Sequence, residues 1–348
     1  MDGTPSGRRF VPLAYTDCAR IIRANLNYGS RRQIAMTGLS MTKFDEIKAT
    51  ERQFDIGKLR MPDGKVELRY GRVLKDKDPS HFVVFLNGRA EWIEKYAYVQ
   101  ADLALPKHVG FLTCDHRGQG GSGGTRAYID SYDTYVSDLL HLIKKMTDGK
   151  PYVLVAHSMG ALISLYGTIT GQLAPRSLVL SSPFLGLPNR PVPIPLARPL
   201  SRTLAHLGLG SISSGAGDFG RATFADNKLT HRADLYQRIV AAPYKIPGAT
   251  FGWVAASFRA IDTCFHADNL KKLSTPTLVL APTLEQVVDP DCARRWALAA
   301  HENAPGAVKL DVFHNARHEL FSELPQIYAG AITATRDWIM PHLQDLQA

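Results

Sequence analysis

Residues 152–160, which read YVLVAHSMG, constrain the fold of this chain more than any other segment. A short apolar run rich in β-branched residues ends at Ser158, and a stretch with helical character, residues 161–166, follows at once. Small residues, Ala156 and Gly160, stand two positions before and after the serine. A strand, a tight turn and a helix form the context in which a G-x-S-x-G pattern exposes a serine hydroxyl at the edge of a sheet. Ala156 departs from that pattern by one methyl group.

Apolar runs and stretches of helical periodicity alternate along most of the chain. The pattern predicts a hairpin of strands 54–59 and 66–73 around the turn MPDGK, then strands at 81–86, 109–114, 152–157, 177–180, 277–280 and 309–312. Helices are expected at 93–103, 132–148, 161–166, 292–302 and 326–340. Strands that alternate with helices predict an α/β chain with a mostly parallel central sheet and helices on both of its faces.

Residues 183–273 interrupt this alternation. The segment opens rich in proline and then shows helical stretches at 200–207, 233–240 and 251–265, with no clear strand. We interpret it as a helical cap inserted into a core formed by residues 54–182 and 274–348. Insertions over the carboxyl ends of parallel strands are where ligand pockets form. Residues 1–53 have few pattern cues and many arginines, and we interpret them as a basic extension.

Composition narrows the class of protein. No apolar run reaches the roughly 18 residues of a membrane-spanning helix, and the first residues, MDGTPSGRR, have no apolar core typical of a secretory signal. The four cysteines are scattered without metal-ligand spacing, which is typical of reduced thiols. We therefore expect a cytoplasmic protein, with peripheral contact at the inner face of the membrane as an alternative, and no metal or cofactor.

The chain has a formal net charge of +9, which favours an anionic partner. No zinc-finger, helix-turn-helix or RNA-recognition signature accompanies the charge, so we expect no nucleic-acid partner. Contact with an anionic membrane, to which the basic residues 1–53 would contribute, is one interpretation. An excess spread over the surface for solubility is the other. The sequence gives no oligomeric state.

A serine hydroxyl needs a neighbouring base, and that base needs an acid to orient it. In sites built on this kind of turn, the chain order is serine, acid, histidine. His318 lies in a loop after the last strand and is the favoured base, with His314 as its nearest rival. Glu285 is the favoured acid after the preceding strand. Asp289 is the alternative, although its position also suits the N-cap of the next helix.

Two backbone N–H groups are expected to form an oxyanion hole. One is that of Met159, directly after the serine and at the start of a helix. The other follows the strand at 81–86, in the loop NGRAE, where Arg89 is the favoured donor. The glycine-rich loop at 115–124 is interpreted as structural, and His157 as a packed residue.

Several motifs together resemble one known family. These are FLNGRAE at 85–91, DHRGQGGS at 115–122, AHSMG at 156–160, LTH at 229–231, GATFGWV at 248–254, EQVVD at 285–289 and HEL at 318–320. They are similar to the lysophospholipase L2 and monoacylglycerol lipase group of α/β-hydrolases. The resemblance covers about residue 54 to the end of the chain. It implies an α/β-hydrolase fold with Ser158 as nucleophile, Glu285 as acid and His318 as base. Asn87 stands where lipases of the group often have histidine.

The leading hypothesis is therefore a serine hydrolase that cleaves the ester of a lipid, a lysophospholipid or a monoacylglycerol, through an acyl-enzyme. In the cap, Leu204, Trp253 and Phe258 are expected to contact the substrate, although such residues also suit the core of the cap itself. A small-ester esterase or a proline-type aminopeptidase on the same fold is the alternative. A non-catalytic binding module is disfavoured, since binding requires no such set of three residues.

Overall fold

The computed structural model describes residues 50–51, 53–189, 192–216 and 222–344. Nearly all of the basic extension predicted for residues 1–53 lies outside these ranges. None of the helices within them has both the length and the apolar character needed to cross a bilayer.

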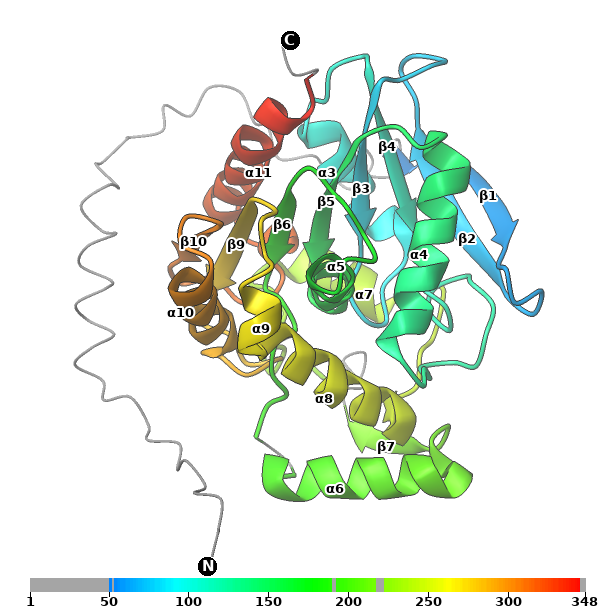
Figure 1. Ribbon diagram of the computed structural model, residues 1–348, viewed down its shortest axis with the longest axis vertical. Coiled ribbons are helices and arrows are strands. Elements are labelled where there is room, and N and C mark those ends of the chain that lie inside the picture. Colours follow the sequence, from blue (N-terminus) through cyan, green and yellow to red (C-terminus); the bar gives the residue numbers. More distant parts are fainter. Residues whose placement is uncertain (1–49, 52, 190–191, 217–221, 345–348) are drawn as a thin grey trace, which may run out of the picture. The chain divides into compact units, whose positions relative to one another are not determined.

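One eight-stranded sheet forms the centre of the fold, in the order β1-β2-β4-β3-β5-β6-β9-β10 (Figure 1). The strands are β1 (Asp55–Arg60), β2 (Glu67–Val73), β3 (His81–Leu86), β4 (Val109–Cys114), β5 (Tyr152–His157), β6 (Leu178–Ser181), β9 (Thr277–Pro282) and β10 (Val308–Phe313). The β1–β2 and β2–β4 pairs are antiparallel, and every pair from β4 to β10 is parallel. The predicted hairpin and the mostly parallel sheet are confirmed.

The two faces of the sheet bury separate apolar cores because side chains alternate along each strand. From β3, Phe82, Val84 and Leu86 join one core, and Val83 and Phe85 join the other. The first core includes α4 (Tyr132–Thr147), α5 (Met159–Ile169) and α10 (Cys292–Asn303), and the second includes α3 (Ala97–Asp102) and α11 (Pro325–Ile339). Helices therefore cover both faces, as the sequence predicts (Figure 1).

Local signals account for both ends of α4. The Ser131 side chain accepts a hydrogen bond from the N–H of Asp133 and caps α4. Asp148, at φ 53°, ends the helix in the left-handed region, and Gly149 follows at φ 73°. The predicted helix at 93–103 instead begins as a 3-10 turn, η1 (Ile93–Tyr96), before α3. Lys95 is buried here together with Ile93 and Tyr96, so the turn is enclosed on more than the one face that an amphipathic helix buries.

The inserted segment is mainly helical. It contains α6 (Ile194–Leu204), the π-helical turn η2 (Ala205–Leu209), α7 (Ala233–Val240) and α8 (Phe251–Phe265), and α9 (Ala267–Leu270) leads back to the sheet. The expectation that it holds no strand is wrong, because β7 (Ser213–Ala216) pairs with β8 (Ala249–Thr250). These strands are too short to give an alternating pattern, and they pair across a long separation in sequence. Short 3-10 turns, η4 (Leu320–Ser322) and η5 (Met340–His342), flank α11.

Helix α6 packs on α8, on the side away from the sheet (Figure 1). The Arg198 guanidinium lies 4.5 Å from the ring centroid of Phe258 and forms an ion pair with Asp262. Ser201 is the one buried residue described in α6. The helix therefore turns most of its side chains toward solvent.

Candidate active site

The turn between β5 and α5 holds Ser158 in a strained conformation. Its backbone has φ 51° and ψ −112°, a region that residues with a side chain rarely adopt. Two backbone hydrogen bonds fix the turn: the N–H of Ser158 donates to the Ser181 carbonyl at 3.0 Å, and its own carbonyl accepts from Phe184 at 3.1 Å. The sharp turn predicted from residues 152–160 is therefore present.

The residues around Ser158 are small because the neighbouring strands lie close to this turn. A Cβ added to Gly160 would lie 2.6 Å from the carbonyl oxygens of both Leu86 and Asn87, at the end of β3. Only glycine lets the start of α5 come this close to the neighbouring strand. Ala156 is fully buried within the sheet between β3 and β6, so the methyl group in place of the usual glycine is accommodated.

His318 and Glu285 meet because β9 and β10 are parallel neighbours whose carboxyl ends lie at one edge of the sheet. The Nδ1 atom of His318 lies 2.7 Å from Oε2 of Glu285. The other carboxylate oxygen accepts the N–H groups of Val287 at 2.8 Å and Val288 at 3.2 Å. The Ser182 hydroxyl donates to the His318 carbonyl at 2.6 Å. Both members of the pair are thus held from more than one side.

The electrostatics of this pair favour a charged imidazole. Burial opposes the protonated form of His318, but the adjacent Glu285 carboxylate outweighs it and raises the pKa of the imidazole. Burial likewise opposes ionisation of Glu285, but His318 and the two backbone donors lower the pKa of that carboxyl. An imidazole with a raised pKa beside an ionised acid is suited to accept a proton during catalysis.

The rival candidates lie elsewhere. Asp289 pairs with Arg295 at 2.6 Å rather than with a histidine. Its expected role as an N-cap is wrong, because α10 begins one turn later and Asp291 occupies the N-cap position. His314 is exposed directly after β10 and does not line the cavity described below.

A cavity of about 690 Å³ opens over these residues. Its lining includes Ser158, Met159, Arg89, Glu285 and His318. Its apolar wall comes from the cap and the loops beside it, with Phe184, Leu187, Leu229, Ile239, Trp253, Val254 and Val288 among its residues. The volume lies within the range of ligand-binding pockets.

Of the three cap residues predicted to contact substrate, one lines the cavity and two do not. Trp253 lines the cavity, where its ring stacks on Phe184 with centroids 5.2 Å apart. The expectation for Phe258 and Leu204 is not met, because neither residue is part of the lining. Phe258 faces α6 under the Arg198 guanidinium, so it belongs to the packing between the cap helices.

The loop after β3 is tightly braced on both sides of Arg89. The N–H of Gly88 donates to the Glu91 carboxylate, and the N–H of Ala90 donates to Oε1 of Gln119 at 2.9 Å. Ala90 itself has φ 64°. The Arg89 backbone thus lies between two N–H groups that are already hydrogen-bonded, and Arg89 and Met159 both line the cavity. Their roles as the two oxyanion-hole donors stay a prediction.

The glycine-rich loop at 115–124 forms hydrogen bonds and ion pairs with the segment that follows β3. Asp115 accepts from the N–H groups of Ile93 at 2.9 Å and Gly121 at 2.7 Å, and it pairs with Arg69. Arg117 bridges Asp63 and Asp138. These contacts are structural, as the sequence interpretation holds.

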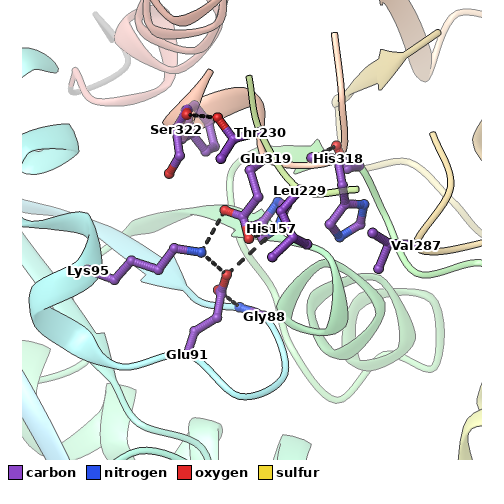
Figure 2. A network of polar contacts seen from close by, with 12 residues as sticks. Gly88, Glu91, Lys95, His157, Leu229, Thr230, Val287, His318, Glu319 and Ser322 are labelled. Carbon is purple, nitrogen blue, oxygen red and sulfur yellow. Dashed lines mark hydrogen bonds and ion pairs between the residues drawn. The ribbon is translucent and has the colours of Figure 1, made fainter. Parts of the chain in front are cut away.

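Sequence reasoning missed a buried ionic cluster (Figure 2), whose residues Glu91, Lys95, His157 and Glu319 belong to the lining of the cavity. The Lys95 ammonium contacts Glu91 and lies 2.6 Å from Oε2 of Glu319. The Nε2 atom of His157 lies 4.0 Å from Glu91 and 3.9 Å from Glu319. Two signals pointed to the cluster: the i,i+4 spacing of Glu91 and Lys95, and the position of Glu319 directly after His318.

The cluster contains the donor types of a metal site. Ligand atoms of Glu91, His157 and Glu319 all lie within 4.8 Å of one another. The ammonium group of Lys95 already contacts both carboxylates, however, and a metal ion would have to displace it against charge repulsion. The three residues therefore do not fit a metal ion.

Fold and site together define the class of this protein. A mostly parallel sheet of this order, a strained serine turn after β5 and a histidine–carboxylate pair after the last strands are those of an α/β-hydrolase fold. A solved structure of a soluble variant of monoglyceride lipase from Saccharomyces cerevisiae matches with a TM-score of 0.68 at 15% identity, covering 83% of this chain and 96% of that one.

The sequence comparison gives the family. Residues 77–325 match the Hydrolase_4 family, described as serine aminopeptidase, S33, and the chain belongs to this family of hydrolases. It is 27% identical over 289 residues to a probable lysophospholipase L2 from Haemophilus influenzae, covering 79% of this chain and 88% of the relative. It is 25% identical over 293 residues to a monoacylglycerol lipase from Mycolicibacterium smegmatis, covering 80% and 95%. The resemblance noted from the motifs is confirmed.

Proposed function

We propose that this protein is a serine hydrolase that cleaves the carboxylic ester of a lipid through an acyl-enzyme intermediate. One observation carries the proposal: the hydrogen-bonded His318–Glu285 pair and Ser158, on its strained turn, line one apolar cavity. The names of the two relatives, a lysophospholipase and a monoacylglycerol lipase, support a lipid ester as the substrate.

In the proposed reaction, Ser158 attacks the ester carbonyl carbon while His318 takes its proton. Glu285 stabilises the resulting imidazolium, and the N–H groups of Met159 and Arg89 stabilise the oxyanion. His318 then gives the proton to the departing alcohol, and the acyl group remains on Ser158. Water, deprotonated by the same imidazole, attacks the acyl-enzyme and releases the fatty acid.

The charged side chains of the cavity favour a lysophospholipid over a monoacylglycerol. Those that are exposed, Lys228 and Lys245, are both cationic, and Arg89 is half-buried. The acidic lining residues, Glu91, Glu285 and Glu319, are buried and paired with Lys95 or His318. An anionic phosphate group is attracted to such a rim, whereas the neutral glycerol of a monoacylglycerol gains nothing from it.

The same charges disfavour an aminopeptidase. A free amino terminus requires a carboxylate to receive it, and each acidic residue of the described lining is already paired. The cavity volume of about 690 Å³ is also larger than a short-chain ester would fill, and its apolar wall suits a longer acyl chain. A binding module is disfavoured because binding does not require a strained serine beside a paired histidine.

We further propose that the cap contacts an anionic membrane through α6 and η2. Leu196 and Leu200 lie one helical turn apart in α6 and are 62% and 48% exposed, and Leu207 of η2 is 65% exposed. Val192, Leu209 and Ile212, which lie next to these residues in sequence, are also exposed. Arg202 and His206 are exposed on the same elements, which suits a surface of anionic lipid.

Labelling with a fluorophosphonate probe tests the catalytic proposal. The wild-type protein is expected to be labelled covalently, and Ser158→Ala is expected to take no label. An unlabelled wild type, or equal labelling of both proteins, would overturn the assignment of Ser158 as nucleophile.

Initial rates on matched substrates test the head group. Lysophosphatidylglycerol, lysophosphatidylcholine and a monoacylglycerol of the same short acyl chain, all kept below the concentration at which micelles form, are compared with a prolyl amide. Lys228→Gln and Lys245→Gln are expected to raise KM several-fold for the anionic substrate and to leave the monoacylglycerol unaffected. Equal effects on both substrates would argue against recognition of the head group by the rim.

A further inference from the structure

The proposed reaction leaves the buried cluster of Glu91, Lys95, His157 and Glu319 without a role. Each of these ionisable side chains is at least 93% buried, an unusual density of ionisable groups for a protein interior. Burying a charge is costly unless it is paired, so a cluster of this kind requires a reason. Its position in the lining of the same cavity as Ser158 and His318 suggests one.

The cluster joins three catalytic segments that are far apart in sequence. Glu91 accepts the N–H of Gly88, so it holds the loop that carries Arg89. Glu319 directly follows His318 in the loop after β10. His157 directly precedes Ser158, and its ring centroid lies 4.8 Å from that of His318. The ammonium group of Lys95 is the link between the first two segments, because it donates to both carboxylates.

The Tyr96 hydroxyl reinforces this link. It lies 2.9 and 3.0 Å from the two oxygens of Glu91 and 3.4 Å from Oε2 of Glu319. Glu91 therefore has three kinds of donor around it, whereas Glu319 depends mainly on Lys95. Without the ammonium group, two carboxylates would face each other in a water-poor site, and at least one loop would have to move or take up a proton.

We propose that Lys95 is a positioning residue whose ammonium group, through Glu91 and Glu319, fixes the oxyanion loop relative to the loop that carries His318. This inference rests on the proposed function, because the two loops need a fixed separation only if a tetrahedral intermediate forms between them. Lys95 acts through other residues and is not itself a catalytic residue. A displacement of about 1 Å between such loops is enough to slow a reaction 100-fold.

Variants at Lys95 test the proposal. Lys95→Met keeps most of the side-chain volume and removes the charge, and Lys95→Arg keeps donors for both carboxylates. We expect Lys95→Met to lower kcat and the rate of fluorophosphonate labelling by about 10- to 100-fold, with KM for a short soluble ester within about threefold. Lys95→Arg is expected to restore much of the lost rate. Labelling of Lys95→Met at the wild-type rate would overturn the inference.

Arg117→Met is the matched control for loss of stability. Arg117 also bridges two carboxylates, Asp63 at 2.6 Å and Asp138 at 2.7 Å, but it lies outside the lining of the cavity. Its removal is expected to lower the unfolding temperature without changing the labelling rate of the folded protein. If Arg117→Met slows labelling as much as Lys95→Met does, the effect at Lys95 is general destabilisation and the inference fails.

Glu319→Gln gives a second, pH-based readout and decides the question if Lys95→Met does not fold. The ionisable groups around His318 and Glu319 are Glu285 from the loop after β9, Glu91 from the loop after β3, Lys95 from η1 and His157 from β5; the Tyr96 hydroxyl also faces the cluster. Burial lowers the pKa of His157 to about 3, so its imidazole is neutral. Burial raises the pKa of the Glu319 carboxyl to about 7, so this group carries its charge above that pH, where the anion favours the imidazolium of His318. Loss of that charge is expected to slow fluorophosphonate labelling above this pH and to move the acid limb of the kcat/KM profile to lower pH. An unchanged profile and an unchanged labelling rate would contradict the inference.

The two proposals fail in different ways. A wild-type protein that takes no fluorophosphonate label refutes the hydrolase function and, with it, this inference. A labelled wild type together with equally reactive Lys95→Met and Glu319→Gln variants refutes only the positioning role.

Discussion

Ser158 combines a strained backbone with close packing against the neighbouring strand. Its φ of 51° persists because the hydrogen bonds to Ser181 and Phe184 hold the turn from both sides. Because Gly160 has no side chain, the start of α5 can lie directly against the end of β3. The strain therefore depends on contacts with β3 and β6, and not on the turn alone.

Gly160→Ala is expected to lower both stability and activity. The new Cβ would lie 2.6 Å from two backbone carbonyl oxygens, which cannot rotate away as a side chain would. Such overpacking costs about 1–3 kcal/mol, and here it also displaces the oxyanion loop that follows Asn87. Thermal unfolding and fluorophosphonate labelling measure the two effects.

Gly330→Ala is the matched control, because this glycine also lies in a helix but would meet only the flexible side chain of Phe313, at 3.3 Å. A helical alanine is favoured over glycine by about 1 kcal/mol, so stability should change little or rise. If the two variants were equally destabilised, the contact with β3 would not be the cause.

Glu285→Gln is expected to lower kcat by a factor on the order of 10³–10⁴. The ionised carboxylate raises the pKa of His318, so a neutral amide lets that pKa fall. The residual activity should therefore extend to lower pH than the wild-type activity, which a pH profile of kcat/KM measures. Asp289→Asn, at the alternative acid, should leave rate and profile unchanged because Asp289 pairs with Arg295. Loss of activity in that variant instead would reverse the assignment.

At the scale of single elements, α6 is notable for its exposed leucines, which would be covered if the helix contacted another surface. Its Arg198 covers Phe258 of α8 and its Ile194 and Ala197 are partly buried against the core, but Leu196 and Leu200 are exposed to solvent. A surface helix of a monomeric domain usually buries its apolar side, so an exposed one marks an interaction surface. Arg202 and His206, which are exposed on α6 and η2, favour contact with an anionic lipid surface.

Replacing Leu196 and Leu200 together by serine is expected to reduce binding to phosphatidylglycerol vesicles several-fold, because the apolar area available for insertion falls. Sedimentation with vesicles measures the binding. Hydrolysis of a short soluble ester should be unchanged, since neither residue lines the cavity. Val312→Ser, an exposed apolar residue of β10 that is 38% exposed, serves as control. Equal loss of binding in the control would show that α6 is not the contact.

At the scale of the whole molecule, the net charge of +9 acts on any anionic surface through long-range attraction. We expect binding to anionic vesicles to weaken as salt rises from about 50 to 500 mM, where the Debye length falls to a few ångströms. Binding to neutral phosphatidylcholine vesicles should be weaker and nearly independent of salt. Affinity for anionic vesicles that does not change with salt would show that net charge has no part in the contact.

Most of the fold could be predicted because its signals are local. Strands such as β3 and β4 have continuous apolar runs with clear ends, and α7 and α8 begin and end where the helical pattern does. The segments that escaped prediction depend on distant partners. The pairing of β7 with β8 and the 3-10 turn of η1 are set by tertiary contacts, and neither leaves a periodic trace in the sequence.

In the candidate site, too, the residues with local signals could be predicted and those that depend on distant partners could not. Ser158 could be predicted from a nine-residue pattern, and His318 and Glu285 from their positions after parallel strands. Leu204 and Phe258 could not be placed, because an apolar residue of a cap helix can face either the cavity or another helix. Lys95 was missed because its partner Glu319 is 224 positions away.

The sequence by itself determined the order of strands and helices, the turn at Ser158 and the expectation that serine, acid and histidine share one edge of the sheet. These features follow from backbone preferences and side-chain periodicity, which act over a few residues. The tertiary structure alone decided which cap residues line the cavity, and it alone gathered Glu91, Lys95, His157 and Glu319 in its lining. Burial and pairing of charges depend on which distant segments meet, and only the folded chain brings them together.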